Sequence, residues 1–327
     1  MSCNCKIQKE GPCIRVLDSN HRVGGHVELQ KTLLGTLTQE SSSGSHCVQF
    51  FLGSAQNYTC RKVDNTDIEK SKAYCEMYGK TFYVHCPLIA NLSKDAKSSD
   101  EKEQAMLEKS WKCVASQVKQ MNGLPAGCVL HMGCKGSLHN LIENLNDFNV
   151  PRNSHITQQR LLNLENAAGQ GSSIGRSFDE IRQVFEGIDR NTIGLCMDTQ
   201  HTFASGSSSL NSHEDIVKFF DEIEAVKGGP PDVIHLNDSK KAFKSQVDRH
   251  ECIGDGFIWS GEKEGLRYLL DRCYESSIDC ILETPDAAKD LDLIRSEFMN
   301  LCTIDCFTKN QKLKDNIRAR LAAPEAL

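Results

Sequence analysis

Short apolar runs that end in polar residues alternate with helix-like segments along this chain, and this alternation restricts the fold more than any other feature. Eight such runs can be read, at residues 13–18, 47–53, 81–87, 127–133, 160–166, 192–199, 232–238 and 279–285. This order is typical of βα units and not of a β-sandwich, and eight units can close into a barrel. We therefore predict an α/β fold that consists of a single (β/α)₈ TIM barrel.

Several boundaries of the helix-like segments can be read from single residues. Gly24 and Gly25 predict a turn between the first apolar run and an amphipathic segment at 26–37, and Ser177 is a predicted N-cap for a helix at 178–188. Further helices are predicted at 105–120, 264–276 and 288–302. We expect an N-terminal extension with little order at 1–12, the barrel at 13–307 and a charged helix or tail at 308–327.

The composition limits the class of protein. With 327 residues and 39% hydrophobic content, the chain can build one large core. No apolar run approaches the roughly 20 residues of a membrane span, and the first residues lack a secretory signal. We therefore expect an intracellular protein of the cytoplasm or nucleus.

The 16 cysteines are scattered through apolar runs, which indicates reduced and mostly buried thiols. Cys3, Cys5 and Cys13 stand close together near the N-terminus, but their spacing matches no standard zinc pattern.

The charge of the chain does not indicate a general nucleic-acid binder. The 38 Lys and Arg against 44 Asp and Glu give a formal net charge of −6. A site for a polyanion must therefore be locally positive. Lys240, Lys241, Lys244 and Arg249 form such a basic segment, although a run of charges is also typical of a solvated loop. The Gly-rich segment 167–175 fits neither the Walker nor the dinucleotide spacing, and we interpret it as a loop beside the site.

Histidines and acidic residues stand at or just after the ends of six predicted strands. These residues are His85, His131, Glu165, Asp198, His235 and Glu283. Active sites of (β/α)₈ barrels lie at the C-terminal ends of the strands, so the six side chains are expected to surround one pocket. His201, Asp248 and His250 add three from adjacent loops, and alternate residues of an extended chain, such as Asp248 and His250, point the same way.

This set of side chains predicts a metal cluster. Imidazole nitrogens and carboxylate oxygens are ligands of zinc and manganese, and a catalytic zinc site uses about three of them with water. Nine candidates therefore indicate two or three ions. Such a cluster suits phosphodiester hydrolysis, and it also suits other hydrolytic and isomerising reactions. A lone histidine on a strand is more often structural, so the grouping carries the prediction. The other histidines are predicted to be solvated: His21, His26, His46, His139, His155 and His213.

Six sequence blocks between about residues 50 and 285 carry a resemblance to a known family. They are VHCPLIANL, LHMG, LNLENAAGQGSSIG, IGLCMDTQHTFASG, HLNDSKKAFKSQVDRHECIGDG and LETP. In this order they resemble the endonuclease IV family of apurinic/apyrimidinic endonucleases. The resemblance implies a (β/α)₈ barrel with three zinc ions, Mn²⁺ being an alternative at one site. It also assigns the ligands: His85, His131 and Glu165 for the first ion, Glu165, Asp198, His235 and Glu283 for the second, and His201, Asp248 and His250 for the third.

The same resemblance implies an activity. Family members incise double-stranded DNA on the 5′ side of an abasic site, leave a 3′-hydroxyl and a 5′-deoxyribose phosphate, and clear blocked 3′ ends. Glu283 would orient or deprotonate the attacking water, and Glu165 would bridge two ions. No nucleotide cofactor and no membrane is implied, and a monomer is expected. A metal-dependent sugar isomerase or epimerase of the related barrels is the alternative enzyme, and a barrel that binds damaged DNA without turnover is the alternative outside catalysis.

The resemblance also implies DNA contacts, and here the sequence departs from the family. Gln56 stands where members commonly carry an arginine, and Leu88 stands where many carry a tyrosine that wedges into the base stack. The first unit lacks the usual His-Val-Ser order before its double glycine. The residues that we predict to contact DNA are Gln56, Tyr58, Leu88, Lys240, Lys241 and Arg249.

Overall fold

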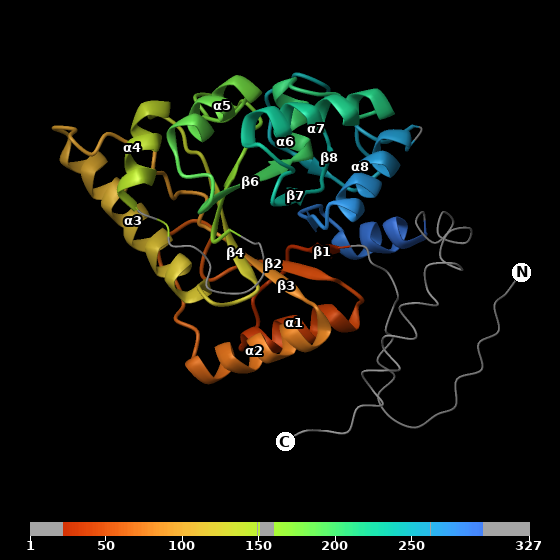
Figure 1. Ribbon diagram of the computed structural model, residues 1–327, viewed down its shortest axis with the longest axis horizontal. Coiled ribbons are helices and arrows are strands. Elements are labelled where there is room, and N and C mark those ends of the chain that lie inside the picture. Colours follow the sequence, from red (N-terminus) through yellow and green to blue (C-terminus); the bar gives the residue numbers. More distant parts are fainter. Residues whose placement is uncertain (1–21, 149, 151–159, 262, 297–327) are drawn as a thin grey trace, which may run out of the picture.

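The computed structural model describes residues 22–148, 150, 160–261 and 263–296. In this part of the chain, parallel strands form one sheet in the order β1-β10-β7-β6-β5-β4-β3-β2, and helices surround it (Figure 1). The strands are β1 (Val23–Gly25), β2 (Cys47–Phe51), β3 (Thr81–His85), β4 (Ala126–His131), β5 (Leu162–Glu165), β6 (Ile193–Asp198), β7 (Val233–His235) and β10 (Asp279–Leu282). The predicted (β/α)₈ barrel is confirmed.

The two ends of the sheet meet at β1 and β2. A parallel bridge pairs His26, just after β1, with Gln49 in β2. The amide of Val27 donates to Gln49 O at 2.8 Å, and the amide of His46 donates to Val23 O at 2.9 Å. These bonds bring the first and second strands together, so the strand ends lie around one axis.

The first strand differs from the sequence prediction. The predicted strand at 13–18 lies outside the described residues, and β1 covers Gly24 and Gly25, where the sequence predicts a turn. A Cβ atom on Gly24 would lie 1.6 Å from Cys47 O. Glycine is therefore required by the close approach of β1 to β2 and not by a turn, and the two uses of glycine look alike in a single sequence.

Helices follow the strands on the outside of the barrel (Figure 1). They are α1 (Leu33–Ser42), α2 (Asn65–Tyr78), α3 (Glu101–Met121), α4 (Leu138–Phe148), α5 (Phe178–Gly187), α6 (Thr199–Ser205), α7 (His213–Lys227) and α8 (Glu264–Glu275). Residues 287–296 are helical too, and the rest of the helix predicted at 288–302 lies outside the described residues. Figure 1 shows α1 and α2 below the sheet, α3 and α4 at its left, and α5 to α7 above it.

Side-chain caps set several helix starts. The hydroxyl of Ser177 accepts from Glu180 N at 3.2 Å, which confirms the predicted cap of α5. The predicted helix at 26–37 starts later, at Leu33, because Thr32 Oγ1 accepts from Gly35 N at 3.0 Å. The helix predicted at 105–120 starts earlier, at Glu101, because Asp100 Oδ1 accepts from Lys102 N at 2.9 Å.

Two groups of buried side chains form the core. The larger group lies between the sheet and the helices. The smaller group comes from strands on all sides of the barrel and therefore fills its interior: Cys47, Tyr83, Val129, Cys196, Val233 and Ile281. The cysteines of the described part are free and most are buried, as predicted. None of the helices in that part is long and apolar enough to span a membrane.

Candidate metal centre

The interior layer of apolar side chains places the site, because side chains two positions apart on a strand point to the same face. Five of the six residues in this layer are followed, two positions later in the chain, by a predicted ligand. The sixth residue, Cys47, is followed two positions later by Gln49. The ligands reached in this way are His85, His131, Asp198, His235 and Glu283. The candidate metal centre is thus the next layer of the barrel interior, at the C-terminal ends of the strands.

The first group of ligands meets around one oxygen of Glu165, at the end of β5. Glu165 Oε2 lies 3.2 Å from His85 Nε2 and 3.1 Å from His131 Nε2. The two imidazole rings come from β3 and β4, with centroids 5.2 Å apart. One ligand atom from each of the three residues lies within 4.8 Å of the others, close enough to hold one ion.

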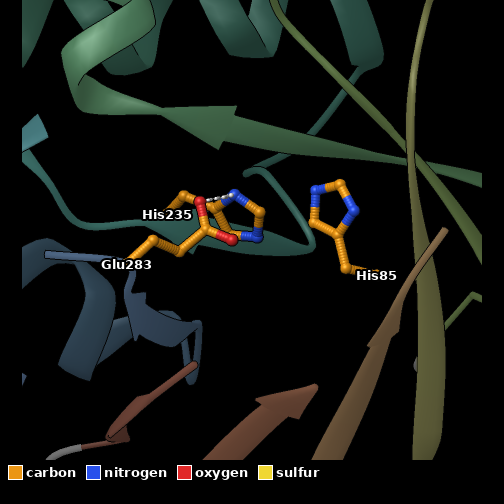
Figure 2. Close-up of side chains that lie close together, drawn as sticks. All are labelled: His85, His235 and Glu283. Carbon is orange, nitrogen blue, oxygen red and sulfur yellow. Dashed lines mark ion pairs between the residues drawn. The ribbon is translucent and has the colours of Figure 1, made fainter. Parts of the chain in front are cut away.

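The second group meets around the other oxygen of the same carboxylate. Glu165 Oε1 lies 3.0 Å from His235 Nδ1, which also lies 3.1 Å from Glu283 Oε2. Asp198 completes a set of four ligand atoms within 4.8 Å of one another. Figure 2 shows His235 and Glu283 side by side, with His85 facing them from β3. Glu165 therefore faces two groups at once, as a bridging carboxylate would.

The third group lies on α6 and on a short hairpin, β8 (Asp238–Ser239) with β9 (His250–Glu251). Asp198 ends β6 and caps α6 by accepting from His201 N at 2.8 Å, so the cap fixes both residues. His201 Nε2 lies 3.4 Å from Asp248 Oδ2, and His250 Nε2 lies 3.5 Å from Asp248 Oδ1. Asp198, His201 and His250 offer ligand atoms within 4.8 Å of one another.

Backbone carbonyls orient three of the histidines. In each, Nδ1 faces a carbonyl oxygen to which it donates, so that Nε2, directed at the centre, is the nitrogen that carries the lone pair when the ring is neutral. The acceptors are Cys86 O for His85 at 2.6 Å, Asn166 O for His201 at 2.9 Å and Glu283 O for His250 at 3.1 Å. The fold thus selects the tautomer that a metal ligand needs.

Burial disfavours the charged form of every group here, so the direction of each pKa shift shows whether neighbouring charges outweigh it. The pKa of Glu165 lies well below its usual value because, against burial, His131 and His235 stabilise the carboxylate. The pKa of Asp248 is lowered to about 2, since burial is outweighed by the hydrogen bond and the charge of His201. Both carboxylates are therefore ionised near neutral pH, the form that binds cations.

The surroundings of His250 Nε2 show whether these residues fit a metal ion. His250 Nε2 is buried and has no hydrogen-bond partner, although its Nδ1 is engaged. Buried polar atoms without a partner are rare in folded proteins. Asp198 Oδ2 lies 3.6 Å from this nitrogen, beyond hydrogen-bonding distance. A cation bound between His250 Nε2 and Asp198 Oδ2 would give this nitrogen a partner. Imidazole nitrogens and carboxylate oxygens are the ligands of zinc and manganese. The residues therefore fit a metal cluster.

Comparison with known proteins agrees with this geometry. A family model described as a xylose isomerase-like TIM barrel matches residues 38–301. The probable endonuclease 4 of Bacillus licheniformis is 30% identical over 280 residues, which cover 82% of this chain and 89% of that protein. The chain belongs to the endonuclease IV family. Its membership makes it a nuclease, a hydrolase of phosphodiester bonds, as the sequence predicts.

Other relatives of this endonuclease IV family member extend the comparison. Probable endonuclease 4 of Bacillus subtilis is 30% identical over 278 residues, or 82% of this chain and 89% of that protein. Apurinic-apyrimidinic endonuclease 1 of Plasmodium falciparum is 28% identical over 290 residues, which are 86% of this chain and 47% of that longer protein.

Two solved structures resemble the family member in fold. Endonuclease IV from Thermus thermophilus matches with a TM-score of 0.70 and 24% identity, over 85% of this chain and 99% of that one. A D-tagatose 3-epimerase-like protein matches with a TM-score of 0.55 and 15% identity, over 85% and 97% of the two chains. At these identities, both matches support the barrel fold alone.

The structure adds polar residues that no sequence motif singles out. Asn237 Nδ2 donates to Asp198 Oδ2 at 2.7 Å, and its Oδ1 accepts from Glu283 N at 2.8 Å. Asn166 Oδ1 accepts from Asp198 N at 2.6 Å. Gln49 is fully buried among the ligands. Asn166 directly follows the predicted ligand Glu165, and Asn237 lies two residues after the predicted ligand His235. This proximity in the sequence is the signal that could have identified both asparagines.

Three of the histidines predicted to be solvated are partly buried. His26 is a wrong prediction, because it is half-buried and its Nδ1 lies 3.1 Å from Glu283 Oε1. His46 is also wrong, since only 21% of its side chain is exposed. His213 is half-buried and stacks on Tyr268, with centroids 3.8 Å apart. His139 is exposed as predicted. The remaining two, His21 and His155, lie outside the described residues.

The predicted DNA contacts lie on two separate parts of the site's rim. Gln56 and Leu88 occupy the loops after β2 and β3, which are joined by a hydrogen bond from Leu88 N to Ala55 O at 2.9 Å. Gln56 is exposed, and so is 45% of the Leu88 residue. Tyr58 is half-buried and uses its hydroxyl to donate to Ile89 O at 3.2 Å. The other three are exposed near the β8–β9 hairpin: Lys240, Lys241 and Arg249.

Proposed function

We propose that this chain is an apurinic/apyrimidinic endonuclease of base excision repair. It would hydrolyse the phosphodiester bond on the 5′ side of an abasic site in double-stranded DNA, leaving a 3′-hydroxyl and a 5′-deoxyribose phosphate. Removal of blocked 3′ ends would use the same site. The names of the relatives support the substrate class. The observation that carries the proposal is that the nine candidate ligand residues form one connected cluster, which includes Glu165.

We further propose that the centre holds three zinc ions, with manganese as an alternative at one position. The first ion would use His85, His131 and Glu165. The other ligands would divide as the resemblance implies: Glu165, Asp198, His235 and Glu283 for the second ion, and His201, Asp248 and His250 for the third. When bound, such ions lower the pKa of water towards neutrality and offset the negative charge that develops on phosphate.

Glu283 is the proposed proton acceptor for the attacking water. Its side chain is 15% exposed, whereas that of Glu165 is 1% exposed, so water reaches Glu283 more readily. Its pKa is held well below the usual value because His235 and His26 outweigh burial. An ionised and accessible carboxylate can orient water and receive its proton. Glu165 is closed to solvent and has both oxygens among imidazoles, which suits a bridge between two ions.

The loops around the centre suggest how damaged DNA would be held. A nucleotide without a base leaves the stack at lower cost than a paired one, which favours abasic sites. Leu88 presents an exposed apolar side chain beside Gln56, and we propose that the two occupy the gap in the duplex. Lys240, Lys241 and Arg249 would contact phosphates, and such contacts position DNA without reading its sequence.

The alternative functions explain fewer of the observations. A sugar isomerase or epimerase shares the barrel, as the epimerase-like structure shows, but one or two ions would leave several of the nine ligand residues without a use. A barrel that binds damaged DNA without turnover would not need Glu283 to remain both ionised and partly accessible. The nuclease accounts for every ligand.

Incision of a duplex with one stable abasic analogue tests the proposal. Wild-type protein loaded with Zn²⁺ is expected to cut once on the 5′ side of the analogue, and prior removal of the metal with a strong chelator is expected to abolish cutting. Glu283→Gln should lower the turnover rate by about 10²- to 10⁴-fold, the usual contribution of a proton-transfer group. Its DNA affinity, measured by fluorescence anisotropy, should stay close to that of the wild type.

Glu186→Gln provides the matched control. This glutamate is exposed on α5, so the same chemical change should leave incision and DNA binding unaltered. Cutting that survives complete metal removal would contradict a metal-dependent mechanism. Equal turnover by Glu283→Gln and wild type would contradict the role of Glu283, and a metal-loaded protein that never cuts the analogue would contradict the proposed function itself.

A further inference from the structure

Gln49 occupies a position that ligands occupy on five other strands. It is two residues beyond Cys47 on β2, in the same relation in which His85 follows Tyr83 and His235 follows Val233. It is fully buried, with 0% exposure. A buried amide in a layer of metal ligands needs partners for three hydrogen-bonding groups, and its neighbours show which partners these are.

The orientation of the Gln49 amide follows from Glu283. The nitrogen Nε2 lies 2.7 Å from Glu283 Oε1, which as a carboxylate oxygen can only accept, so the amide NH₂ must face it. The same nitrogen lies 3.0 Å from His26 Nδ1. The amide oxygen Oε1 is left facing His235 Nε2, also at 3.0 Å.

This orientation determines which nitrogen of His235 carries the proton. Gln49 Oε1 accepts a hydrogen bond, so His235 Nε2 must be its N–H donor. In the neutral ring the lone pair then lies on Nδ1, which faces Glu165 and Glu283 at 3.0 and 3.1 Å. His85, His201 and His250 are oriented by backbone carbonyls and present Nε2 instead. His235 differs from these three because a side chain of another strand orients it.

We propose that Gln49 is a positioning residue of the metal centre. It holds His235 in the tautomer that presents Nδ1, and it holds Glu283 Oε1 so that Oε2 lies beside His235 Nδ1, where both atoms could serve the second ion. It touches neither the substrate nor the ion. The proposal rests on the metal-dependent function proposed above, and it concerns the second site only, because the ligands of the first and third sites make no hydrogen bond with Gln49 among the described residues.

Gln49→Met tests the proposal because methionine has a similar length and shape but cannot form these hydrogen bonds. The number and affinity of bound Zn²⁺ ions would be measured by elemental analysis and by competition with a chromogenic chelator. One ion is expected to bind about 10- to 100-fold more weakly, the usual effect of losing an outer partner of a ligating histidine, while the affinities of the other ions stay unchanged.

Gln117→Met is the control, since Gln117 is equally buried on α3 and lies outside the barrel interior. It should leave all ion affinities as in the wild type. In the zinc-loaded protein, the His235 Nε2–H proton resonance should move upfield in Gln49→Met and stay in place in Gln117→Met, a change that a packing role alone does not produce. If Gln49→Met does not fold, Gln49→Asn is used, because its shorter amide cannot reach His235 and Glu283 together.

The outcomes separate the two proposals. Equal Zn²⁺ affinities in Gln49→Met and Gln117→Met, or an unmoved His235 resonance, would overturn the positioning role while leaving incision by the wild type intact. Wild-type protein that binds Zn²⁺ but does not cut abasic DNA would overturn the proposed function and leave the positioning role standing. Wild-type protein that binds no Zn²⁺ would overturn the positioning role together with the metal centre.

Discussion

Asp279 organises the end of the barrel opposite to the metal centre. It begins β10, and its carboxylate accepts from Arg22 Nε at 2.7 Å, Thr81 Oγ1 at 2.7 Å and Tyr83 OH at 2.8 Å. His46 Nε2 lies 3.9 Å from the same carboxylate, too far for a hydrogen bond, and has no other partner. The strands thus carry a second polar cluster at their N-terminal ends, where residues of barrels serve stability and not catalysis.

His46 predicts a specific pH dependence of stability. Burial lowers its pKa from 6.5 to about 4, more than the nearby Asp279 raises it. The unfolded chain therefore binds a proton near pH 6.5 that the folded protein binds only near pH 4, so acidification between these values favours unfolding. At about 1.4 kcal/mol per pKa unit, the loss of unfolding free energy approaches about 3 kcal/mol at the acid end.

Urea unfolding of metal-free protein between pH 7 and pH 4 measures this effect. His46→Leu should lose less stability than the wild type over the range, because no histidine at this position takes up a proton on unfolding. His139→Leu, at a site where 77% of the side chain is exposed, should keep the wild-type dependence. Identical pH profiles for wild type and His46→Leu would show that burial of His46 has no such consequence.

The sequence predicts well which candidate ligands converge, and it predicts poorly which residues support them. His85 and His235 end apolar runs, so strand position alone predicts that they converge. Gln49 is the single polar residue inside the apolar run of β2, and no residue pattern shows that it faces imidazoles. His26 was missed because β1 was predicted at 13–18, which moved the end of the first strand away from it. Distinguishing such residues from ordinary buried polar groups requires knowledge of the register between strands.

At the scale of elements, one carboxylate organises the segment that carries the third ligand group. Asp238 is fully buried at the start of the β8–β9 hairpin. Its oxygens accept from the amides of Ser239 at 2.7 Å, Gly254 at 2.9 Å and Ile258 at 2.8 Å. The chain from β9 to α8 contains little regular structure, so these bonds replace the ladder that a longer strand would provide. The position of β9, and with it that of His250, therefore depends on Asp238.

Asp238→Asn tests this dependence. The asparagine keeps the shape but places an NH₂ group against backbone amides that also donate, so at least one bond becomes a repulsive contact. We expect the free energy of unfolding, measured with urea, to fall by about 2–3 kcal/mol, as for a buried donor left without a partner. Asp95→Asn is the control, because Asp95 accepts from Lys97 N at 2.8 Å in an exposed turn and should cost less. Equal losses in the two variants would contradict the organising role.

Helix and strand positions were predicted where local chemistry decides them. Ser177 and α5 were correct because an N-cap is a local hydrogen bond. The strands with predicted ligands were correct to within a few residues, since their apolar runs are bounded by polar residues on both sides. β1 was missed because its sequence, VGG, is determined by contact with Cys47 and not by strand preference. Non-local contacts of this kind leave no periodicity in a single sequence.

At the scale of the whole molecule, the distribution of charge must reconcile a net charge of −6 with a polyanionic substrate. The ionised carboxylates of the centre point into the barrel, where imidazoles surround them and bound cations would offset them. Lys240 and Lys241 point outwards instead, and 63% of the Lys240 side chain is exposed. The hairpin that supplies Asp248 and His250 thus also supplies positive charge on the rim of the same site.

The salt dependence of DNA binding tests whether this rim carries the phosphates. Each phosphate contact adds about 0.9 to the magnitude of the slope of log affinity against log salt concentration, through the release of counterions. The double variant Lys240→Ala/Lys241→Ala should therefore bind abasic duplex DNA more weakly at low salt, with a slope smaller by about 2, while turnover at saturating DNA stays near the wild-type value. Lys102→Ala/Lys109→Ala removes two exposed lysines from α3, on the outside of the barrel, and should leave the slope unchanged. An equal change of slope in both double variants would show that the effect comes from net charge alone and that the hairpin holds no phosphate.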